Sequence, residues 1–275
     1  MKGRSKMSDT NSYEEKLQLS HYMTEPVIRA AIESLNLPAG SRGLDAGCGI
    51  GLHLPIMAEA VGKGGSVTGL DLSPTFITRA EKIVEESGFS GRIALKTGDV
   101  NVLPFEDDTF HWVWSANLVG YHPAFEPIAL LGELIRVVRP GGTVVIIFWS
   151  SQQLLCGHPM LEARLNATTP GIAPFREGMR LGSHFMRGLG WFRAVGLKDA
   201  RVQTFVGEVR PPLSDEMKDA MVSLFDMRWG GARSEVGQEV WDEYLRLTEP
   251  ESADFILNLE DYYAFFTYTM FWGTA

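Results

Sequence analysis

Two hydrophobic periods alternate along the chain as far as residue 149. Short apolar runs typical of buried strands are separated by stretches in which apolar residues recur every three or four positions, as on one face of a helix. The predicted strands are 43–46, 66–73, 93–96, 110–115 and 143–149, and the predicted helices are 24–35, 52–61, 74–87 and 125–138. This alternation predicts an α/β fold with a parallel, doubly wound sheet.

Capping and breaking residues mark the ends of these helices. Thr24 is the expected cap of the first helix, with a proline in the first turn, and Ser73 with Pro74 begins the third. Gly88 is expected to end that helix, and the Arg-Pro-Gly-Gly stretch 139–142 to end the fourth.

The regular alternation of predicted strands and helices ends in the C-terminal part of the chain. We expect a connector over 150–181, a helix near 182–195, a strand over 200–208, mostly helix over 213–259 and an aromatic strand over 261–272.

The pattern as a whole predicts three parts in chain order. These are an N-terminal helical cap (1–40), a ligand-binding core (41–150), and a segment that completes the sheet and adds helical insertions (151–275). Methionines and large aromatics are frequent in the third part, where they form either core or a substrate lid. They are Met179, Met186, Met217, Met221, Phe225, Met227, Trp229 and Trp241.

Composition and charge narrow the classes of partner. The 275 residues are 45% hydrophobic and 21% charged, as in ordinary globular proteins. There are 25 Lys and Arg against 34 Asp and Glu, for a formal net charge of -9, with no lysine/arginine cluster. Since binding to a phosphate backbone depends on basic patches, we expect a small ligand and no nucleic acid.

Cysteine usage and the N-terminus indicate a cytoplasmic protein. Cys48 and Cys156 form no Cys-x-x-Cys or Cys/His cluster, so we expect neither a disulfide framework nor a structural zinc site. No apolar segment follows the charges of residues 1–16, and no run approaches the roughly 20 apolar residues of a membrane-spanning helix.

A glycine loop follows the first predicted strand, in the string LDAGCGIG. Its spacing is Gly47-x-Gly49-x-Gly51, and Leu52 occupies the third small-residue position of the dinucleotide motif G-x-G-x-x-G/A. Glycine loops at such a place bind nicotinamide dinucleotides and several other nucleotides, so the loop alone leaves the ligand open.

Two carboxylates follow the next two strands. Asp71 stands where a side chain accepts both hydroxyls of a ribose, although an exposed turn aspartate is the simpler alternative. Asp99, with the N–H of Val100, has the acceptor and donor that an adenine edge requires; alternatively, Asp99 caps a turn.

Four motifs of the chain, taken in their order and spacing, are similar to those of a known protein family. The chain resembles the class I S-adenosylmethionine-dependent methyltransferases, within the broad group that contains the quinone-biosynthesis C-methyltransferases. The motifs are LDAGCGIG (44–51), VTGLDLS (67–73), GDVNVLPFEDDTFHWVWSANLVGYH (98–122) and RVVRPGGTVVI (136–146). The resemblance covers residues 20–150 in motif detail. It implies a seven-stranded, Rossmann-like fold, with S-adenosylmethionine as cofactor and S-adenosylhomocysteine as product.

The resemblance also implies roles for residues of the glycine loop. Asp45 would lie near the methionine amino group of the cofactor. The backbone of Gly47, Cys48, Gly49 and Gly51 would approach the cofactor closely, because glycines present no intervening side chain. Cys48 is expected to be a small buried residue, not a nucleophile.

Other roles fall on the loops after the second, third and fourth strands and on the N-terminal segment. Asp71 would hold the ribose and Leu72 would pack on the adenine. The stretch Gly98-Asp99-Val100 would read the adenine edge. Asn117 and Leu118 would lie at the methionine end, and Tyr22 belongs to a segment that would fold over the cofactor.

The candidates for catalysis lie directly after the fourth strand. Histidine titrates near neutrality, so His122 is a candidate base, although it equally suits a helix-capping role, and Tyr121 is its neighbour. No metal is expected, because Ser115-Ala116-Asn117 occupies the place of the acidic residue in metal-dependent relatives. Residues 117–120 also lack the (Asp/Asn)-Pro-Pro-(Tyr/Phe) string of enzymes that methylate amino groups of bases or glutamine.

Methyl transfer to an apolar or aromatic small molecule is therefore the function that we expect. A nicotinamide oxidoreductase, a non-catalytic module that binds S-adenosylmethionine, and a protein-methylating enzyme are the alternatives. The acceptor atom and the oligomeric state are not specified by these motifs.

Overall fold

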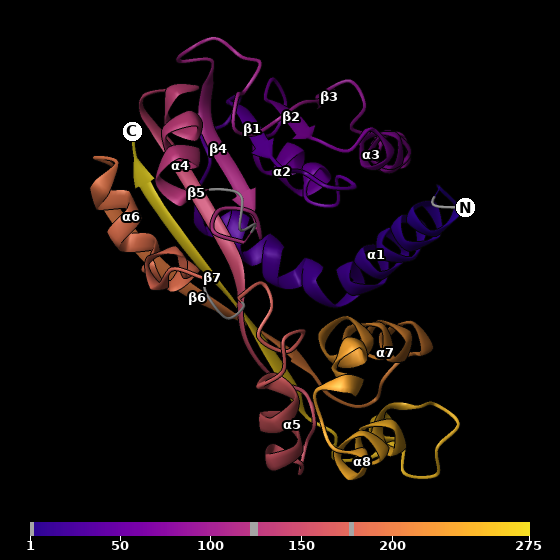
Figure 1. Ribbon diagram of the computed structural model, residues 1–275. Coiled ribbons are helices and arrows are strands. Elements are labelled where there is room, and N and C mark those ends of the chain that lie inside the picture. The colour runs from indigo at the N-terminus through magenta and orange to yellow at the C-terminus, as the bar shows by residue number, and fades with distance from the viewer. Residues whose placement is uncertain (1–2, 122–125, 176–178) are drawn as a thin grey trace. The chain divides into compact units, whose positions relative to one another are not determined.

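The computed structural model describes residues 3–121, 126–175 and 179–275 of the chain (Figure 1). Its strands form one seven-stranded sheet in the order β3-β2-β1-β4-β5-β7-β6. The strands are β1 (Arg42–Ala46), β2 (Ser66–Asp71), β3 (Ile93–Thr97), β4 (Phe110–Ala116), β5 (Val138–Gln153), β6 (Lys198–Val209) and β7 (Ala264–Thr274). The pairings of β1 with β2 and β4, of β2 with β3 and of β4 with β5 are parallel. The predicted doubly wound, mostly parallel sheet is thus confirmed.

Eight α-helices and four 3₁₀ turns are described in those parts of the chain. The helices are α1 (Gly3–Ser34), α2 (Leu54–Ala60), α3 (Pro74–Ser87), α4 (Pro127–Arg136), α5 (Pro159–Asn166), α6 (Gly188–Ala194), α7 (Asp215–Trp229) and α8 (Gln238–Thr248). The 3₁₀ turns are η1 (Leu181–Ser183), η2 (Phe185–Arg187), η3 (Gly230–Ser234) and η4 (Ile256–Asn258).

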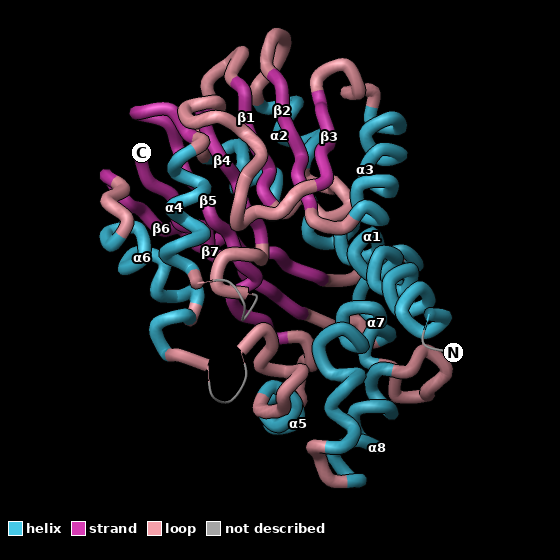
Figure 2. Tube along the Cα trace, turned by 45° about the horizontal axis from the view of Figure 1, so that its top comes forward, coloured by secondary structure: helices cyan, strands magenta, loops and turns pink. Residues whose placement is uncertain are grey.

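The strand order changes direction between β1 and β4. From β1 the chain moves outward through β2 to β3, then returns to β4 and continues to β5 on the other side. Right-handed crossovers in opposite directions place their helices on opposite faces of the sheet. Accordingly, α2 lies behind β1 and β2 in Figure 2, whereas α4 lies in front of β4 and β5. Ligands of open α/β sheets bind at such a reversal, outside the carboxyl ends of the strands.

The third helix begins and ends as its sequence predicts. The Ser73 hydroxyl oxygen accepts a hydrogen bond from the Phe76 N–H at 3.3 Å, with Pro74 in the first turn. Gly88 follows the helix in the left-handed conformation, with φ of 76°. This helix packs on β2 and β3 and so fixes the loop that follows Asp71.

Two predicted helix boundaries are wrong. The first helix does not begin at Thr24: α1 begins at Gly3, Pro26 lies inside it, and Thr24 is a buried helical residue. The stretch 139–142 does not end the fourth helix, because α4 already ends at Arg136 and β5 includes this stretch. There the pairing jumps from Phe110–Val138 to Trp112–Thr143, as a β-bulge does.

The C-terminal part contains the predicted strands but more broken helices. The strands 200–208 and 261–272 correspond to β6 and β7, and the helical region 213–259 to α7, α8 and intervening 3₁₀ turns. The expected helix near 182–195 is two 3₁₀ turns followed by the short α6. The connector 150–181 contains a helix, α5, that was not predicted.

The chain divides into two compact units, each assembled from three stretches. The first unit contains Met1–Pro26, Ser150–Gly178 and Val206–Thr267, and the second contains Val27–Trp149, Met179–Phe205 and Tyr268–Ala275. The three-part division by chain order stays a prediction. No helix in the described ranges combines the length and apolar character that crossing a bilayer requires.

Several C-terminal aromatic and methionine residues form the core of the first unit. Met221, Phe225 and Trp229 of α7 are fully buried, with the last two rings stacked at 6.3 Å. The Trp229 indole N–H donates to Asn166 Oδ1 of α5 at 3.0 Å. These residues are therefore core. Met186, in the second unit, is by contrast 55% exposed.

Candidate cofactor and acceptor site

The glycine loop after β1 is held in a left-handed conformation. Gly47, Gly49 and Gly51 have φ of 80°, 55° and 83°, in the left-handed region that glycine adopts more readily than other residues. The N–H groups of Gly47 and Cys48 donate to the Leu70 carbonyl of β2 at 2.8 and 2.9 Å. The loop is therefore fixed to the end of β2, with its backbone open to close approach.

This loop also meets the loop after β4. A Cβ on Gly47 would lie 2.7 Å from Leu118 Cδ2, and one on Gly51 would lie 2.9 Å from Ala80 Cβ of α3. Larger residues at either position would push the neighbouring elements apart. The predicted residues after β1 and β4 thus lie together at the reversal of strand order.

The Asp71 carboxylate supports the loop from β2. Its Oδ2 accepts the Gly49 N–H at 2.9 Å, and its Oδ1 accepts the Ser73 N–H at 2.9 Å. Each oxygen retains a lone pair, as a ribose-binding carboxylate requires. Leu72 follows with 63% of its surface exposed, so it is available to cover a flat ring.

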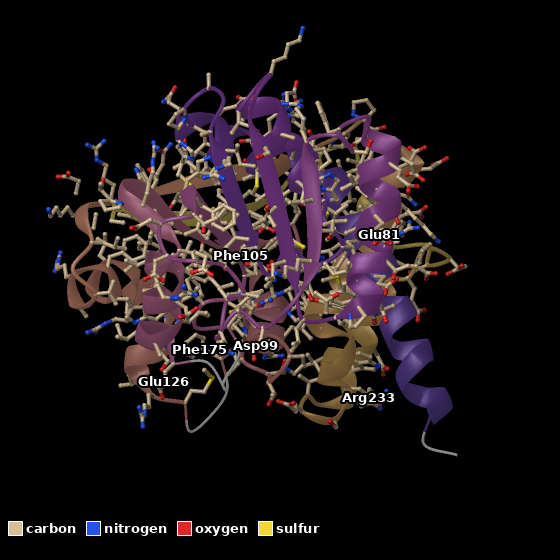
Figure 3. All side chains as sticks on the ribbon, turned by 90° about the horizontal axis from the view of Figure 1, so that it is seen from above. Glu81, Asp99, Phe105, Glu126, Phe175 and Arg233 are labelled. Atoms are coloured by element: carbon tan, nitrogen blue, oxygen red, sulfur yellow. The ribbon has the colours of Figure 1, made fainter. Side chains whose placement is uncertain are left out.

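Asp99 lies directly beyond the end of β3, where the loops of the sheet meet (Figure 3). Its Oδ1 accepts hydrogen bonds from the Asn101 backbone N–H at 2.9 Å and from the Asn101 side chain at 2.8 Å. Asp99 therefore caps the turn, which is the simpler of its two predicted roles. The preceding Gly98 donates its N–H to the Asp71 carbonyl at 2.9 Å, and Val100 is buried.

Asp45 is the most unusual group of this site. It is 1% exposed, and neither carboxylate oxygen receives a hydrogen bond from the described residues. Burial, and then the charge of Asp71, raise its pKa to about 8. A buried carboxyl group without a partner is costly, which indicates that a cationic or hydrogen-bond-donating ligand belongs beside it.

Cys48 is not suited to nucleophilic chemistry. Burial and the carboxylates of Asp45 and Asp71 raise the pKa of its thiol well above the usual range. The reactive form of cysteine is the thiolate, which this environment disfavours. Cys48 is half-buried, not fully buried as predicted.

Asn117 fixes the loop after β4. It adopts a left-handed φ of 49°, and its side-chain Oδ1 accepts the Trp149 N–H of β5 at 2.9 Å. Its own N–H donates to the Ile147 carbonyl at 2.8 Å. The amide side chain thereby holds the turn that positions Leu118 against the glycine loop.

Tyr121 belongs to an aromatic wall on the same unit. Its ring stacks on Phe148 at 5.7 Å and lies 6.1 Å from Phe185, while its hydroxyl donates to the Trp149 carbonyl at 3.0 Å. This hydrogen bond orients Tyr121 as part of the wall. The other candidate base, His122, lies outside the described residues.

The motifs did not reveal the rest of this wall. Phe185 lies 5.2 Å from Phe148, and the ring of His184 stacks on Phe185 at 4.7 Å. A Cβ on Gly120 would lie 2.5 Å from the Trp191 ring. The segment 179–193 therefore borders the loop after β4, and its aromatic residues were the only sequence signal.

Tyr22 belongs to the other unit. It is 53% exposed, and its hydroxyl lies 3.4 Å from the Ser214 hydroxyl. Its expected role over the cofactor stays a prediction, as do the roles of the other site residues.

The second unit suits S-adenosylmethionine, which has a cationic sulfonium and amino group and no phosphate. The unsatisfied Asp45 carboxyl group and the glycine cradle fit the cationic amino-acid end, and Asp71 has free lone pairs for a ribose. No group of three or more potential metal ligands occurs among the residues that the structure describes.

Comparisons with known proteins match part of this chain to methyltransferases. Residues 44–142 match the family model described as "Methyltransferase domain". The chain is 36% identical over 123 residues to demethylmenaquinone methyltransferase of Bacillus velezensis, covering 45% of this chain and 52% of that protein. It is 40% identical over 108 residues to phosphatidylethanolamine N-methyltransferase of Cereibacter sphaeroides, covering 39% and 50%. The chain thus spans about half the length of the curated relatives it matches.

Solved structures share the fold. A SAM-dependent methyltransferase from Aquifex aeolicus matches with a TM-score of 0.51 at 21% identity, covering 69% of this chain and 89% of that one. A putative methyltransferase from Bacillus halodurans matches with a TM-score of 0.52 at 16% identity, covering 90% and 97%.

Residues 44–142 therefore contain a methyltransferase domain, and the solved structures share its fold. Over this domain the predicted resemblance is confirmed, and it favours S-adenosylmethionine over a nicotinamide dinucleotide as the cofactor.

Proposed function

We propose that this protein transfers a methyl group from S-adenosylmethionine to an apolar or aromatic small molecule, without a metal ion. The observation that carries the proposal is the buried Asp45 carboxyl group without a described partner beside a left-handed glycine loop. When bound, S-adenosylmethionine supplies an activated methyl group on a sulfonium.

The residues of the second unit have distinct binding tasks in this proposal. Ionised Asp45 would pair with the amino group of the cofactor, and Asp71 would accept the ribose hydroxyls. Asp99 and Val100 would take the adenine edge, for which Asp99 keeps Oδ2 available. The turn held by Asn117 would position the methionine end. Such fixed groups accelerate a displacement mainly by orienting the reactants and excluding water.

In the aromatic wall Phe148 and Phe185 are buried, so only the partly exposed Tyr121 supports an apolar or aromatic acceptor from this side. One relative, from Synechocystis, is named 2-methyl-6-phytyl-1,4-hydroquinone methyltransferase; it is 31% identical over 152 residues, or 50% of this chain and 46% of that protein. An acceptor with an acidic hydroxyl or amine would lose its proton to a base, and His122 is the candidate. A cytoplasmic location, predicted from the cysteine usage, belongs to the same proposal.

Calorimetry and labelled-methyl transfer test the proposal. We expect S-adenosylhomocysteine to bind and NAD not to bind. We also expect methyl label to pass from S-adenosylmethionine into a hydroquinone or another component of an apolar metabolite extract. Binding of NAD alone would refute the cofactor assignment. Binding of S-adenosylhomocysteine without transfer to any extract component would instead favour a non-catalytic module.

A further inference from the structure

The segment 179–198 differs in charge from the rest of the protein. It contains Arg180, Arg187, Arg193 and Lys198 and no Asp or Glu, in a chain of net charge -9. The basic residues are spaced at five to seven positions, so they form no cluster in the sequence. Arg180 directly precedes η1, Arg187 ends η2, Arg193 lies in α6 and Lys198 begins β6.

Apolar side chains protrude between these cations. Leu181 of η1 is 89% exposed and Met186 of η2 is 55% exposed, and Arg187 and Arg193 are exposed around them. Exposed apolar side chains among cations are costly in water unless another phase or surface receives them.

Helix α4 continues this surface. It packs beside α6, as Figures 1 and 2 both show. Its exposed positions Ile128, Ala129 and Gly132 carry no charge. The acidic residue Glu126, labelled in Figure 3, forms an ion pair with Arg180 at 3.1 Å, so it removes one positive charge from this face and adds no net negative charge. We call Ile128, Arg180, Leu181, Met186, Arg187 and Arg193 the basic-apolar face.

The geometry points to the basic-apolar face as a docking surface for an anionic lipid bilayer. The centre of a protein interface is usually depleted of charge, with polar residues at its rim. Here arginines and protruding apolar side chains alternate within the same segment, which is the composition of surfaces that lie in a bilayer interface. Anionic headgroups complement the arginines, while Leu181 and Met186 can enter the acyl boundary without a shaped groove.

The face is connected to the aromatic wall. Phe185, between Leu181 and Met186 in the chain, is buried and lies 5.2 Å from Phe148 and 6.1 Å from Tyr121. Docking would therefore hold the loop after β4 next to the bilayer surface. The proposal itself concerns binding, so it stands whether or not the protein transfers a methyl group.

Sedimentation with vesicles tests this proposal. We expect the full-length protein to bind vesicles of equal parts phosphatidylglycerol and phosphatidylcholine, and not vesicles of phosphatidylcholine alone. Each basic residue near an anionic surface contributes about fivefold to binding. Replacing Arg187 and Arg193 by Gln should therefore weaken binding roughly 25-fold. Binding should also weaken at high salt because the headgroup charge is screened.

A second variant and a matched control separate docking from misfolding. Leu181→Ser with Met186→Ser should weaken binding at least tenfold, since it removes two inserted side chains. Arg201→Gln with Val202→Ser changes an exposed arginine and an exposed valine of β6 and should leave binding unchanged. All variants should bind S-adenosylhomocysteine as the unmodified protein does.

Three results would overturn the proposal. They are no binding to the anionic vesicles, equal loss in the β6 control, and loss of vesicle binding only together with loss of S-adenosylhomocysteine binding. Binding to heparin together with the first of these results would assign the face to a polyanion.

Discussion

At the scale of single residues, Asp45 links the protonation of the protein to its ligand. Its folded pKa of about 8 lies far above the value of about 3.9 expected in an unfolded chain. Between these values the folded protein holds a proton that the unfolded chain has released. Asp45 therefore destabilises the ligand-free fold increasingly from about pH 4 to about pH 8.

The first prediction concerns Asp45→Asn in the ligand-free protein. The variant should unfold at higher temperature, with a gain that grows from pH 4 to pH 8 and then becomes constant. Thermal unfolding over this pH range measures the gain. A constant or decreasing gain would show that Asp45 is ionised in the folded protein.

The second prediction concerns binding by the same residue. A cationic ligand requires ionised Asp45, so below pH 8 its binding should release about one proton, and the affinity for S-adenosylhomocysteine should rise with pH. Asp45→Asn should lower the affinity at pH 8 at least tenfold and remove this pH dependence, because one charged hydrogen bond contributes about 1.5–3 kcal/mol. Calorimetry in two buffers of different ionisation enthalpy measures the proton count, and an unchanged count in the variant would exclude Asp45.

The third prediction concerns the glycine cradle. Gly47→Ala should weaken S-adenosylhomocysteine binding more than tenfold, because its φ is 80° and the new Cβ would lie 2.7 Å from Leu118. Gly64→Ala has a similar φ of 90° but open space around its Cβ, so it serves as a matched control for backbone strain. Equal effects of the two variants on binding would contradict the role of close contact.

The sequence motifs predicted that the backbone of the glycine loop is open to a ligand. They did not predict that the carboxyl group of Asp45 receives no hydrogen bond from the described residues. The spacing of Gly47, Gly49 and Gly51 was sufficient to predict the loop, because glycine adopts a left-handed backbone at little cost. The unsatisfied state of Asp45 depends on what surrounds the side chain in space. The sequence contains no local signal for that.

At the scale of elements, helix ends were predicted well where a side chain caps the backbone. Ser73 of α3 illustrates this, because its hydroxyl meets the Phe76 N–H as the Ser-Pro pair indicates. Where no side chain caps the backbone, the ends of the helices depend on tertiary packing and were predicted less well. The helix expected from Thr24 extends back to Gly3 despite Pro26, and the turn-forming stretch 139–142 became a bulge inside β5.

The fourth prediction concerns the α3 cap. Ser73→Ala should lower the free energy of unfolding by about 1 kcal/mol, because one helix N–H loses its acceptor. Ser73→Thr keeps the hydroxyl and should remain within about 0.5 kcal/mol of the original protein. Denaturant unfolding of both variants measures the difference. Equal stabilities would show that the 3.3 Å contact contributes little.

At the scale of the whole molecule, chain order predicted the architecture only in part. The alternation of strands and helices up to residue 149 was enough for the doubly wound sheet, because crossover rules leave few other arrangements. The aromatic wall joins Tyr121 to Phe185, which lie far apart in the sequence, and no periodicity encodes such a pairing. The two compact units are likewise assembled from separated stretches.

The division into units leads to the fifth prediction, on hydrogen exchange with S-adenosylhomocysteine. Every proposed cofactor residue except Tyr22 belongs to the second unit. A ligand at one hundred times its Kd stabilises the state that binds it by about 2.7 kcal/mol. Amides of residues 46–51, 70–73, 98–101 and 117–121 should therefore exchange more slowly in the complex.

The peptide containing Tyr22 decides what the first unit contributes. If the N-terminal segment covers the cofactor, this peptide should also gain protection, and Tyr22→Ala should remove that gain while residues 46–51 remain protected. The α7 peptide 215–229 serves as the internal control, because its amides belong to the core of the first unit. Protection confined to the second unit would exclude Tyr22 from the site, whereas equal protection of the α7 peptide would show that binding stabilises both units as one.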